Sequence, residues 1–283
     1  MNRSMINASN TMTQLQQQLD LISNNMANAN TVGYKRRETN FSELLYQQFN
    51  NQPNKQAEIG RSTPFSIRQG SGARLAHTSV QMTPGALKQT NRPLDAALTQ
   101  ENLFFKVLVN ENGQQVVRYT RDGSFHLAPT NNAGQWMLAD SNGNAVAGPN
   151  DAPILVRGSV KEVRIDANGN FTAVPENTAL PDQTFELGIV EVKKPHLLQG
   201  KGNNLFGLPN LNALNLTVQD VVEEVDGAGR AGLNIRQGAL EESNVDMASE
   251  MTELMITQKS YQFNSKSISI ADQMMGLVNG LRS

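Results

Sequence analysis

A glycine pattern late in the chain is the first candidate for chemistry. Residues 227–232 spell G-x-G-x-x-G, which in dinucleotide-binding proteins lies between a buried strand and a helix whose N-terminus holds the pyrophosphate. Glu223, Glu224 and Asp226 stand where that strand would have to end, and residues 233–235 resemble a strand where the helix should begin. The pattern therefore predicts a connector and no cofactor site.

Histidines and Asp/Asn clusters are the next candidates, as metal ligands. His77, His126 and His196 lie far apart, and none has a partner at the spacing of metal ligands on a helix. Residues 140–144 and 166–170 resemble the opening of a calcium loop, but both lack a glycine at the sixth position and a glutamate at the twelfth. They predict hairpin turns, and the sequence indicates no metal site.

The residue arrangements of a nucleophilic or acid–base catalyst are also missing. The G-x-S-x-G elbow does not occur, cysteine is absent, and neighbouring carboxylates such as Glu241 and Glu242 do not identify an acid/base pair. We therefore expect a protein that is not an enzyme and has no small-molecule substrate.

Composition narrows the classes of protein to which the chain can belong. The chain has 283 residues, 38% of them hydrophobic, which is enough for a core. Its 24 basic and 26 acidic residues leave a net charge of −2, so charge predicts binding neither to nucleic acid nor to an acidic membrane. Glutamines at 14 and 16–18 interrupt any apolar leader, so we expect no cleavable secretory signal, and no apolar run is long enough to cross a bilayer.

The N-terminal residues instead carry a long helical pattern. Apolar residues recur with alternating steps of three and four, which predicts an amphipathic helix with one narrow heptad seam that must find a partner. Asn28, Asn30 and Gly33 then favour a turn, so the helix should end near Asn30. The seam consists of Met5, Ala8, Met12, Leu15, Leu19, Ile22, Met26 and Ala29.

The C-terminal residues predict a second and longer helix, from a capping box at Ser243 and Asp246 to Leu281. At about 1.5 Å per residue this helix could exceed roughly 50 Å. Two apolar lines with a spacing of seven residues are offset by two positions, about 200° around the helix, so it needs neighbours on both sides. One line is Ile256, Phe263, Ile270 and Leu277, joined by Met274 and Leu281, and the other is Leu254, Tyr261, Ile268 and Met275. A helix buried inside an ordinary globular domain is the alternative.

The middle of the chain contains strand-forming runs separated by turn residues, as is typical of β-structure. We expect an α+β fold: residues 1–40 and 243–283 as the two halves of a helical coiled-coil domain, 41–73 as a linker, 74–210 as a mainly antiparallel β domain and 211–242 as a connector. Strands are predicted at residues 104–109, 115–119, 160–165 and 187–192. Hairpin turns are predicted at Asn112-Gly113, Asp122-Gly123, Asn142-Gly143 and Asn168-Gly169.

Several pieces of the sequence resemble the bacterial flagellar rod and hook proteins. Residues 27–35 (ANANTVGYK) are similar to the N-terminal signature of that family, which usually has proline where Val32 stands. The most specific piece is 237–246 (QGALEESNVD), which continues through 250–261 (EMTELMITQKSY) to Asp272. Further pieces follow in the family's order: 92–95 (RPLD), 102–105 (NLFF), 119–125 (YTRDGSF) and 202–206 (GNNLF).

This resemblance implies a structural subunit of the flagellar basal body. The terminal helices would pair as a coiled coil, line a tubular polymer that transmits torque, and place the β domain outside it. The implied partners are copies of the chain, other axial rod and hook proteins, and the flagellar type III export apparatus, which would carry the protein out of the cytoplasm. The length favours a rod over a hook subunit, and the sequence leaves proximal and distal rod positions open. A hook-type subunit, a secreted coiled-coil adaptor and a secreted hydrolase are the competing hypotheses.

Overall fold

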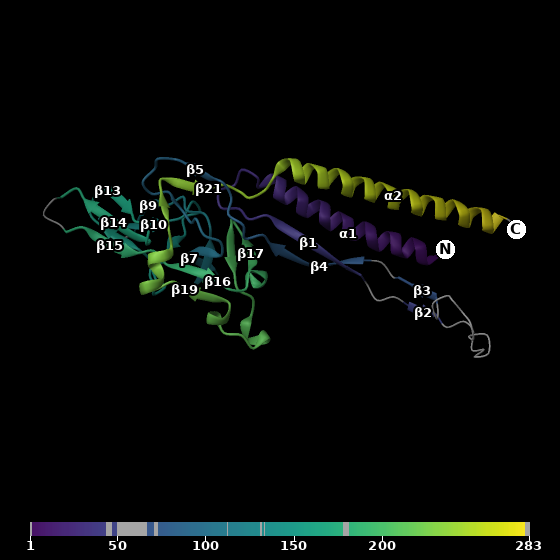
Figure 1. Ribbon diagram of the computed structural model, residues 1–283, viewed down its shortest axis with the longest axis horizontal. Helices are drawn as coiled ribbons and strands as arrows, with labels where there is room; N and C mark the ends of the chain where they lie inside the picture. The colour runs from purple at the N-terminus through teal and green to yellow at the C-terminus, as the bar shows by residue number, and fades with distance from the viewer. Residues whose placement is uncertain are drawn as a thin grey trace. The chain divides into compact units, whose positions relative to one another are not determined.

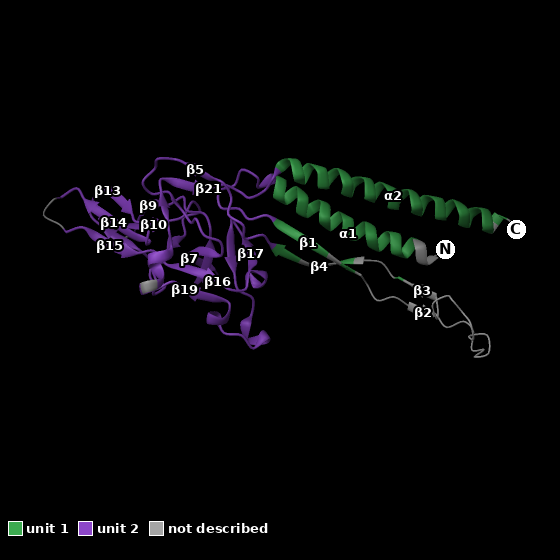
Figure 2. Cartoon of the chain, viewed as in Figure 1, with its two compact units in different colours: residues 1–26, 37–79, 247–283 green, residues 27–36, 80–246 purple. Residues whose placement is uncertain are grey.

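The computed structural model describes residues 2–43, 47–49, 67–70, 73–111, 113–130, 132, 134–177 and 181–280. The chain divides into two compact units (Figure 2). Unit 1 contains residues 1–26, 37–79 and 247–283, and unit 2 contains residues 27–36 and 80–246. The helices belong to unit 1 and most strands belong to unit 2, which confirms the predicted α+β class with helices at both ends and antiparallel strands between them.

Unit 1 is built from two long helices and a β ribbon (Figure 1). The helices run in opposite directions, and the side-chain amide of Asn25 in the first donates to the carboxylate of Glu250 in the second, with Nδ2 and Oε2 3.2 Å apart. The second helix has 34 residues and is therefore about 51 Å long. The elements are α1 (Asn2–Ala27), α2 (Met247–Gly280), and the antiparallel pairs of β1 (Arg37–Glu43) with β4 (Ala73–Val80) and β2 (Gln47–Phe49) with β3 (Ile67–Gln69).

Unit 2 is organised around a 10-stranded sheet. Its longest strand, β7 (Leu103–Glu111), pairs with β8 on one edge and with β16 and β11 on the other. The order is β12-β10-β11-β7-β8-β18-β17, with β9 on β10 and with β16 on β7 and β19. The other strands of this sheet are β8 (Gln114–Thr120), β9 (His126–Pro129), β10 (Gln135–Ala139), β11 (Ala145–Val146), β12 (Leu155–Arg157), β16 (Ile189–Val192), β17 (Gln199–Gly202), β18 (Leu205–Gly207) and β19 (Val222–Glu224).

Smaller elements complete unit 2. A three-stranded sheet has the order β13-β14-β15, and two short antiparallel pairs join the residues before α2 to the start of the unit. These strands are β13 (Val160–Ile165), β14 (Asn170–Pro175), β15 (Gln183–Glu186), β5 (Leu87–Gln89) with β21 (Ala239–Glu241), and β6 (Ala96–Ala97) with β20 (Arg236–Gln237). Four 3₁₀ helices, η2 (Pro195–Leu197), η3 (Leu211–Leu214), η4 (Val218–Asp220) and η5 (Gly227–Gly232), lie in the described part of the unit.

The two faces of β7 explain how unit 2 forms its core. Successive side chains of a strand point to opposite faces, so Phe104 and Phe105 serve different clusters. Phe105 packs edge-on against Phe125, with ring centroids 5.1 Å apart, in the larger cluster, and Phe104 packs edge-on against Phe206 at 5.5 Å in the second. The sequence at 103–109 is apolar at every position but Lys106 because both faces of this strand are covered.

Three of the four predicted turns lie in hairpins. Residues 142–143 join β10 to β11, residues 168–169 join β13 to β14, and Gly113 lies in the β7–β8 hairpin with φ +82°, while Asn112 is outside the described residues. In each of the two Asp/Asn loops the aspartate carboxylate accepts backbone N–H groups two and four residues later, as expected of turns.

Other predictions were wrong in detail. Asp122-Gly123 is no hairpin turn: a Cβ on Gly123 would lie 1.7 Å from the carbonyl oxygen of Ala96, so glycine is required there by close packing. Helix α1 ends at Ala27, close to the predicted end near Asn30, so Ala29 of the predicted seam lies in the turn that follows the helix. Helix α2 begins at Met247, and Ser243 Oγ accepts from Val245 N–H in a local turn instead of capping a helix.

The predicted linker and connector also contain regular structure. Residues 44–46, 50–66 and 71–72 of the predicted linker lie outside the described residues. Strands β2 and β3, which flank residues 50–66, pair with each other. The glycine pattern at 227–232 forms η5, and Arg230 fixes it in place, since Arg230 is 5% exposed and donates to the carbonyl oxygens of Gly169 and Leu187. Neither described helix contains an apolar stretch of the length that a bilayer crossing needs.

Candidate functional site

The predicted seam of α1 lies on the covered side of the helix. Ile22 is 1% exposed and Ala8 is 9% exposed. The other six seam residues, Met5, Met12, Leu15, Leu19, Met26 and Ala29, are half-buried. By contrast, Asn10, Gln16 and Asp20 between them are exposed, as the heptad pattern predicts.

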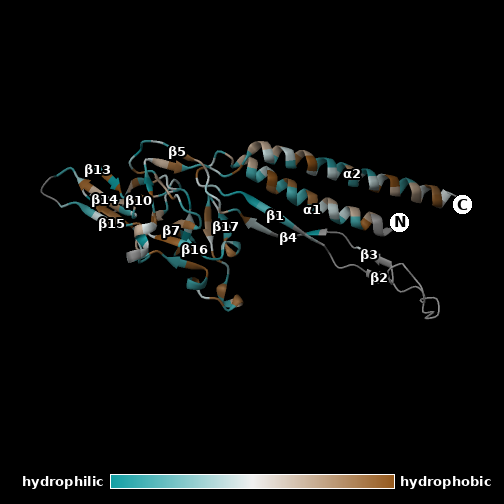
Figure 3. Cartoon of the chain, viewed as in Figure 1, coloured by the Kyte–Doolittle hydropathy of each residue, from teal (hydrophilic) through white to brown (hydrophobic). Residues whose placement is uncertain are grey.

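The two apolar lines of α2 differ sharply in exposure. We call Leu254, Tyr261, Ile268 and Met275 the inner stripe, since all four are half-buried. We call Ile256, Phe263, Ile270 and Leu277 the outer stripe, and these are 61%, 66%, 61% and 69% exposed. In Figure 3, hydrophobic segments in brown recur along α2 between hydrophilic segments in teal. A row of exposed hydrocarbon of this length is typical of a surface that another protein covers.

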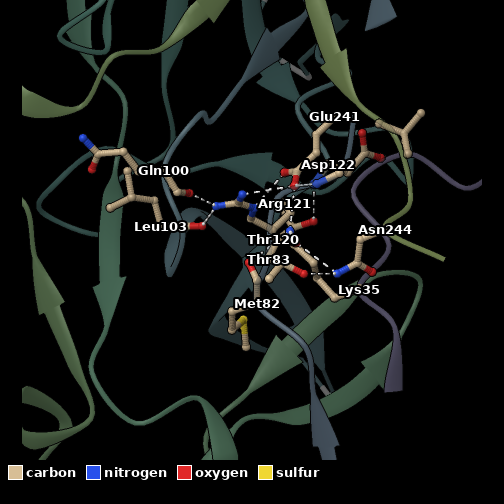
Figure 4. A network of polar contacts seen from close by, with 12 residues as sticks. Lys35, Met82, Thr83, Gln100, Leu103, Thr120, Arg121, Asp122, Glu241 and Asn244 are labelled. Atoms are coloured by element: carbon tan, nitrogen blue, oxygen red, sulfur yellow. Dashed lines mark hydrogen bonds and ion pairs between the residues drawn. The ribbon is translucent and has the colours of Figure 1, made fainter. Parts of the chain in front are cut away.

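Unit 2 contains a second feature, a buried ion cluster formed by Lys35, Arg121 and Glu241 (Figure 4). The Glu241 carboxylate accepts from Lys35 Nζ at 2.6 Å and from Arg121 Nε at 2.8 Å and Nη2 at 3.1 Å. The three side chains are at most 1% exposed. Lys35 follows α1 in the chain, Arg121 follows β8, and Glu241 ends β21, so one carboxylate joins three distant segments.

Backbone groups satisfy the rest of the cluster. Arg121 Nη1 donates to the carbonyl oxygens of Gln100 and Leu103, both at 2.7 Å, and Lys35 Nζ donates to that of Thr83 at 2.8 Å. The backbone N–H of Gly85 donates to Glu241 Oε1 at 3.0 Å. A buried charge is tolerated only when it is paired and fully hydrogen-bonded, and this cluster meets that condition.

A glycine allows the cluster to close. Gly33 has φ +67°, and a Cβ there would lie 2.6 Å from the backbone carbon of Arg121. Its N–H donates to the backbone carbonyl of Glu241 at 2.8 Å. Residue 33 must therefore be glycine both for its conformation and for the close approach of the chain that carries Lys35.

Six of the pieces that resemble the flagellar family lie in unit 2 and are joined around this cluster: 27–35, 92–95, 102–105, 119–125, 202–206 and 237–246. Besides the three charged residues, Asn204 Nδ2 donates to the carbonyl oxygen of Val32 at 2.7 Å, and Gly238 N–H donates to that of Asp95 at 2.8 Å. Val32 stands where the family usually has proline, and its carbonyl makes a contact that either residue can make. These six pieces thus form one connected structure.

Burial and neighbouring charges shift the pKa values of the cluster. Burial lowers the pKa of Lys35 below its ordinary value of 10.5, and the charge of Arg121 lowers it further against the effect of Glu241. Burial alone would raise the pKa of Glu241, but the charges and hydrogen bonds of Arg121 and Lys35 outweigh it and hold this pKa below 4.5. Glu241 is therefore ionised at neutral pH, between two cations.

This shift predicts acid sensitivity of unit 2. The folded-state pKa of Glu241 lies below its unfolded value, so its contribution to stability is complete above pH 4.5 and is lost as the pH falls through the folded-state pKa. As the pH is lowered below 4.5, we expect the free energy of unfolding to decrease, and to decrease less steeply in Glu241→Gln. Denaturant unfolding at a series of pH values measures both slopes; equal slopes would contradict the assignment.

Unit 2 also has a groove among its described residues. It lies beside β16 and β19, and its lining includes Tyr119, Asp226 and two glutamates that pair with lysines, Glu223 with Lys193 and Glu224 with Lys106. Burial raises the pKa of Tyr119 to about 12, so its phenol stays neutral. Among the described residues, no three of His, Cys, Asp or Glu gather as metal ligands.

Sequence reasoning missed Lys35 and Arg121 and considered Glu241 only as a catalyst. One local signal was available: Ala239 and Glu241 share a face of β21, and both are buried. Strand alternation could therefore have placed Glu241 inside the protein. Its two partners are 206 and 120 residues away, and no spacing in the sequence connects them.

Known proteins resemble this chain over its whole length. It is 42% identical to the flagellar hook-basal body complex protein FlhP of Bacillus subtilis over 283 residues, 99% of each chain. It is 31% identical to the flagellar basal-body rod protein FlgG of Borreliella burgdorferi over 287 aligned residues, which cover 100% of this chain and 99% of that protein. The chain belongs to the flagellar basal-body rod protein family. A third relative is the flagellar basal-body rod protein FlgG of B. subtilis, 29% identical over 96% of each chain.

Two family domains locate the parts that rod proteins share. Residues 5–35 match the family described as flagella basal body rod protein, and residues 236–281 match the family described as flagellar basal body rod FlgEFG protein C-terminal. These ranges contain most of α1 and α2, and they include Lys35 and Glu241. The rod-protein domains therefore carry both the exposed helix surface and two of the three members of the ion cluster.

Proposed function

We propose that this rod-family protein is a structural subunit that polymerises through α1 and α2 into a helical, tubular part of the flagellar axis and transmits torque. The observation that carries the proposal is the outer stripe of α2, whose four apolar side chains are more than half exposed. Copies stacked head to tail would bury this stripe in a contact that does not close into a ring, which yields a filament.

The free energy of burying the outer stripe supports assembly as the step that completes the packing of the helices. Fully burying a leucine, isoleucine or phenylalanine contributes about 1.5 to 3 kcal/mol, and the outer stripe supplies four such side chains. Helix pairing as a coiled coil within one subunit would bury the α1 seam and the inner stripe first. Neighbouring subunits would then bury the outer stripe.

The location follows from this role. Relatives named flagellar basal-body rod proteins support a location in the basal body, and we propose that the subunit lies outside the cytoplasmic membrane, carried there by the flagellar type III export apparatus. The proposed partners are copies of this chain and other rod and hook proteins of the axis.

Amide hydrogen exchange tests the assembly mechanism. We expect the amides of α1 and α2 to exchange faster in free subunits than in the polymer, since their contacts are incomplete until neighbours bind, while those of β7 and β8 are protected in both states. Sedimentation of the same samples separates an open polymer, which grows with concentration, from the closed dimer expected of an adaptor. Equal protection of both helices in monomer and polymer would count against the proposal.

A further inference from the structure

The exposed stripe of α2 is the more hydrophobic of the two. The four residues of the outer stripe have only hydrocarbon side chains, two isoleucines, a phenylalanine and a leucine, and the neighbouring Met274 adds one thioether. The inner stripe contains the hydroxyl of Tyr261 and the thioether of Met275. Burial of apolar surface alone would turn the outer stripe inward. The structure has the opposite arrangement, so another interaction must choose which face of α2 is covered.

A buried polar contact lies on the covered face. Glu250 is 0% exposed, and it stands four residues before Leu254, on the same side of α2 as the inner stripe. Its carboxylate accepts from Asn25 Nδ2 at 3.2 Å, and Asn25 is 1% exposed. A buried carboxylate next to a buried amide stabilises little by comparison with apolar packing, but it is satisfied in only one arrangement.

Asn25 is itself fixed in place. Its Nδ2 donates to the carbonyl oxygen of Arg37 at 2.9 Å, and its Oδ1 accepts from the N–H of Arg37 at 3.1 Å. The side chain thereby completes both backbone hydrogen bonds of the first residue of β1 and cannot turn to follow α2. A rotation of α2 by about 200°, which would exchange the stripes, would carry Glu250 away from this fixed partner.

We infer that the Asn25–Glu250 contact determines the orientation of α2, and that it keeps the more hydrophobic stripe outward at the cost of intramolecular burial. A single polar residue in an apolar helix seam is known to specify one register among several of similar energy. The inference deepens the proposed function, on which it rests. A subunit whose outer stripe turned inward would bury that stripe within itself and would have no outer stripe left for its neighbours to cover.

Thiol labelling of free subunits tests this orientation, because the chain has no cysteine of its own. The reagent is a maleimide, and each cysteine is introduced singly into the natural sequence and labelled in dilute solution. The maleimide should react with Phe263→Cys about tenfold faster than with Ile268→Cys, since a covered thiol reacts only after local opening. Adding Glu250→Leu should invert this ratio. Adding Asn25→Leu should do the same.

Two controls separate orientation from stability. Glu250→Gln retains an oxygen that can accept from Asn25 and should keep the natural labelling ratio. Ser249→Leu adds the same leucine one position away, on the exposed side, and should also leave the ratio unchanged. An unchanged ratio in Glu250→Leu overturns the inference. Fast, equal labelling at both sites with loss of helical circular dichroism also overturns it, because the contact would then hold α2 in place without selecting its face.

The labelling requires no polymer, so it separates this inference from the proposed function. If the natural chain fails to polymerise but labels as described, the orientation holds and the assembly proposal falls. If the natural chain polymerises and Glu250→Leu labels and polymerises like it, the assembly proposal holds and the orientation inference falls.

Discussion

Subunits carrying Glu241→Gln are expected to lose about 3 to 5 kcal/mol of the free energy of unfolding, because removal of one partner from a buried ion pair leaves uncompensated charge. Two cations, Lys35 and Arg121, depend on this carboxylate, and all three side chains are at most 1% exposed. Glutamine preserves the shape of Glu241 and part of its hydrogen bonding, so the loss reports the missing charge. Denaturant unfolding, followed by the fluorescence of the single tryptophan, Trp136 in β10, measures the change.

The neighbouring glutamate provides the matched control. Glu242 is 48% exposed at its side chain and pairs with Lys88 at 3.7 Å. Exposed pairs contribute about 0 to 1 kcal/mol, so Glu242→Gln should change the free energy of unfolding by no more than that. If the two variants unfold at the same denaturant concentration, the ion cluster does not hold the segments that carry Lys35 and Glu241 onto the β region.

Phe263→Asp is expected to have the largest effect on assembly. Phe263 is 66% exposed in the subunit, so the substitution should leave the subunit folded and the unfolding of the β region unchanged. In the polymer the carboxylate would be buried without a partner, which costs several kcal/mol, about 3 or more. That cost should raise the concentration needed for polymerisation by about a hundredfold or more. The measurements are sedimentation of purified subunits, incorporation into basal bodies, and motility.

Two further variants distinguish the stripe from the helix as a whole. Gln262→Asp places the same charge one position away, at an exposed site outside both stripes, and should assemble almost normally. Phe263→Leu keeps the site apolar and should assemble with only a modest loss. Ile270→Asp, one heptad further along, should behave like Phe263→Asp. Normal incorporation and motility of Phe263→Asp would refute the assignment of the outer stripe to the assembly contact.

The periodic features of this protein were predictable because they are local. The α1 seam repeats every three or four residues, and in the structure two of its eight members are buried and six are half-buried. The β7–β8 hairpin was predictable from runs of β-branched and aromatic residues on both sides of a turn at residues 112–113. Each of these patterns involves residues that are close in the sequence, where the geometry of one helix or strand dictates which side chains share a face.

Long-range contacts decided two features that the sequence did not predict. Asp122-Gly123 has the composition of a hairpin turn, but its glycine serves the close approach of Ala96, 27 residues earlier in the chain. Residues 227–232 read as a connector because their fixing contacts, from Arg230 to carbonyl oxygens near residues 169 and 187, are 61 and 43 residues away. Long-range packing gave both segments a structure that their own residue types do not indicate.

By itself, the sequence determined that α2 has two opposed apolar faces and that the ends of the chain are helical. Only the tertiary structure decided which face is covered, since that choice depends on Asn25 and Glu250, 225 residues apart. It also brought Lys35 and Arg121 to one carboxylate at Glu241. Helical periodicity is a property of neighbouring residues, whereas a buried hydrogen bond or ion pair exists only where the folded chain brings its two partners together, and desolvation then makes it specific.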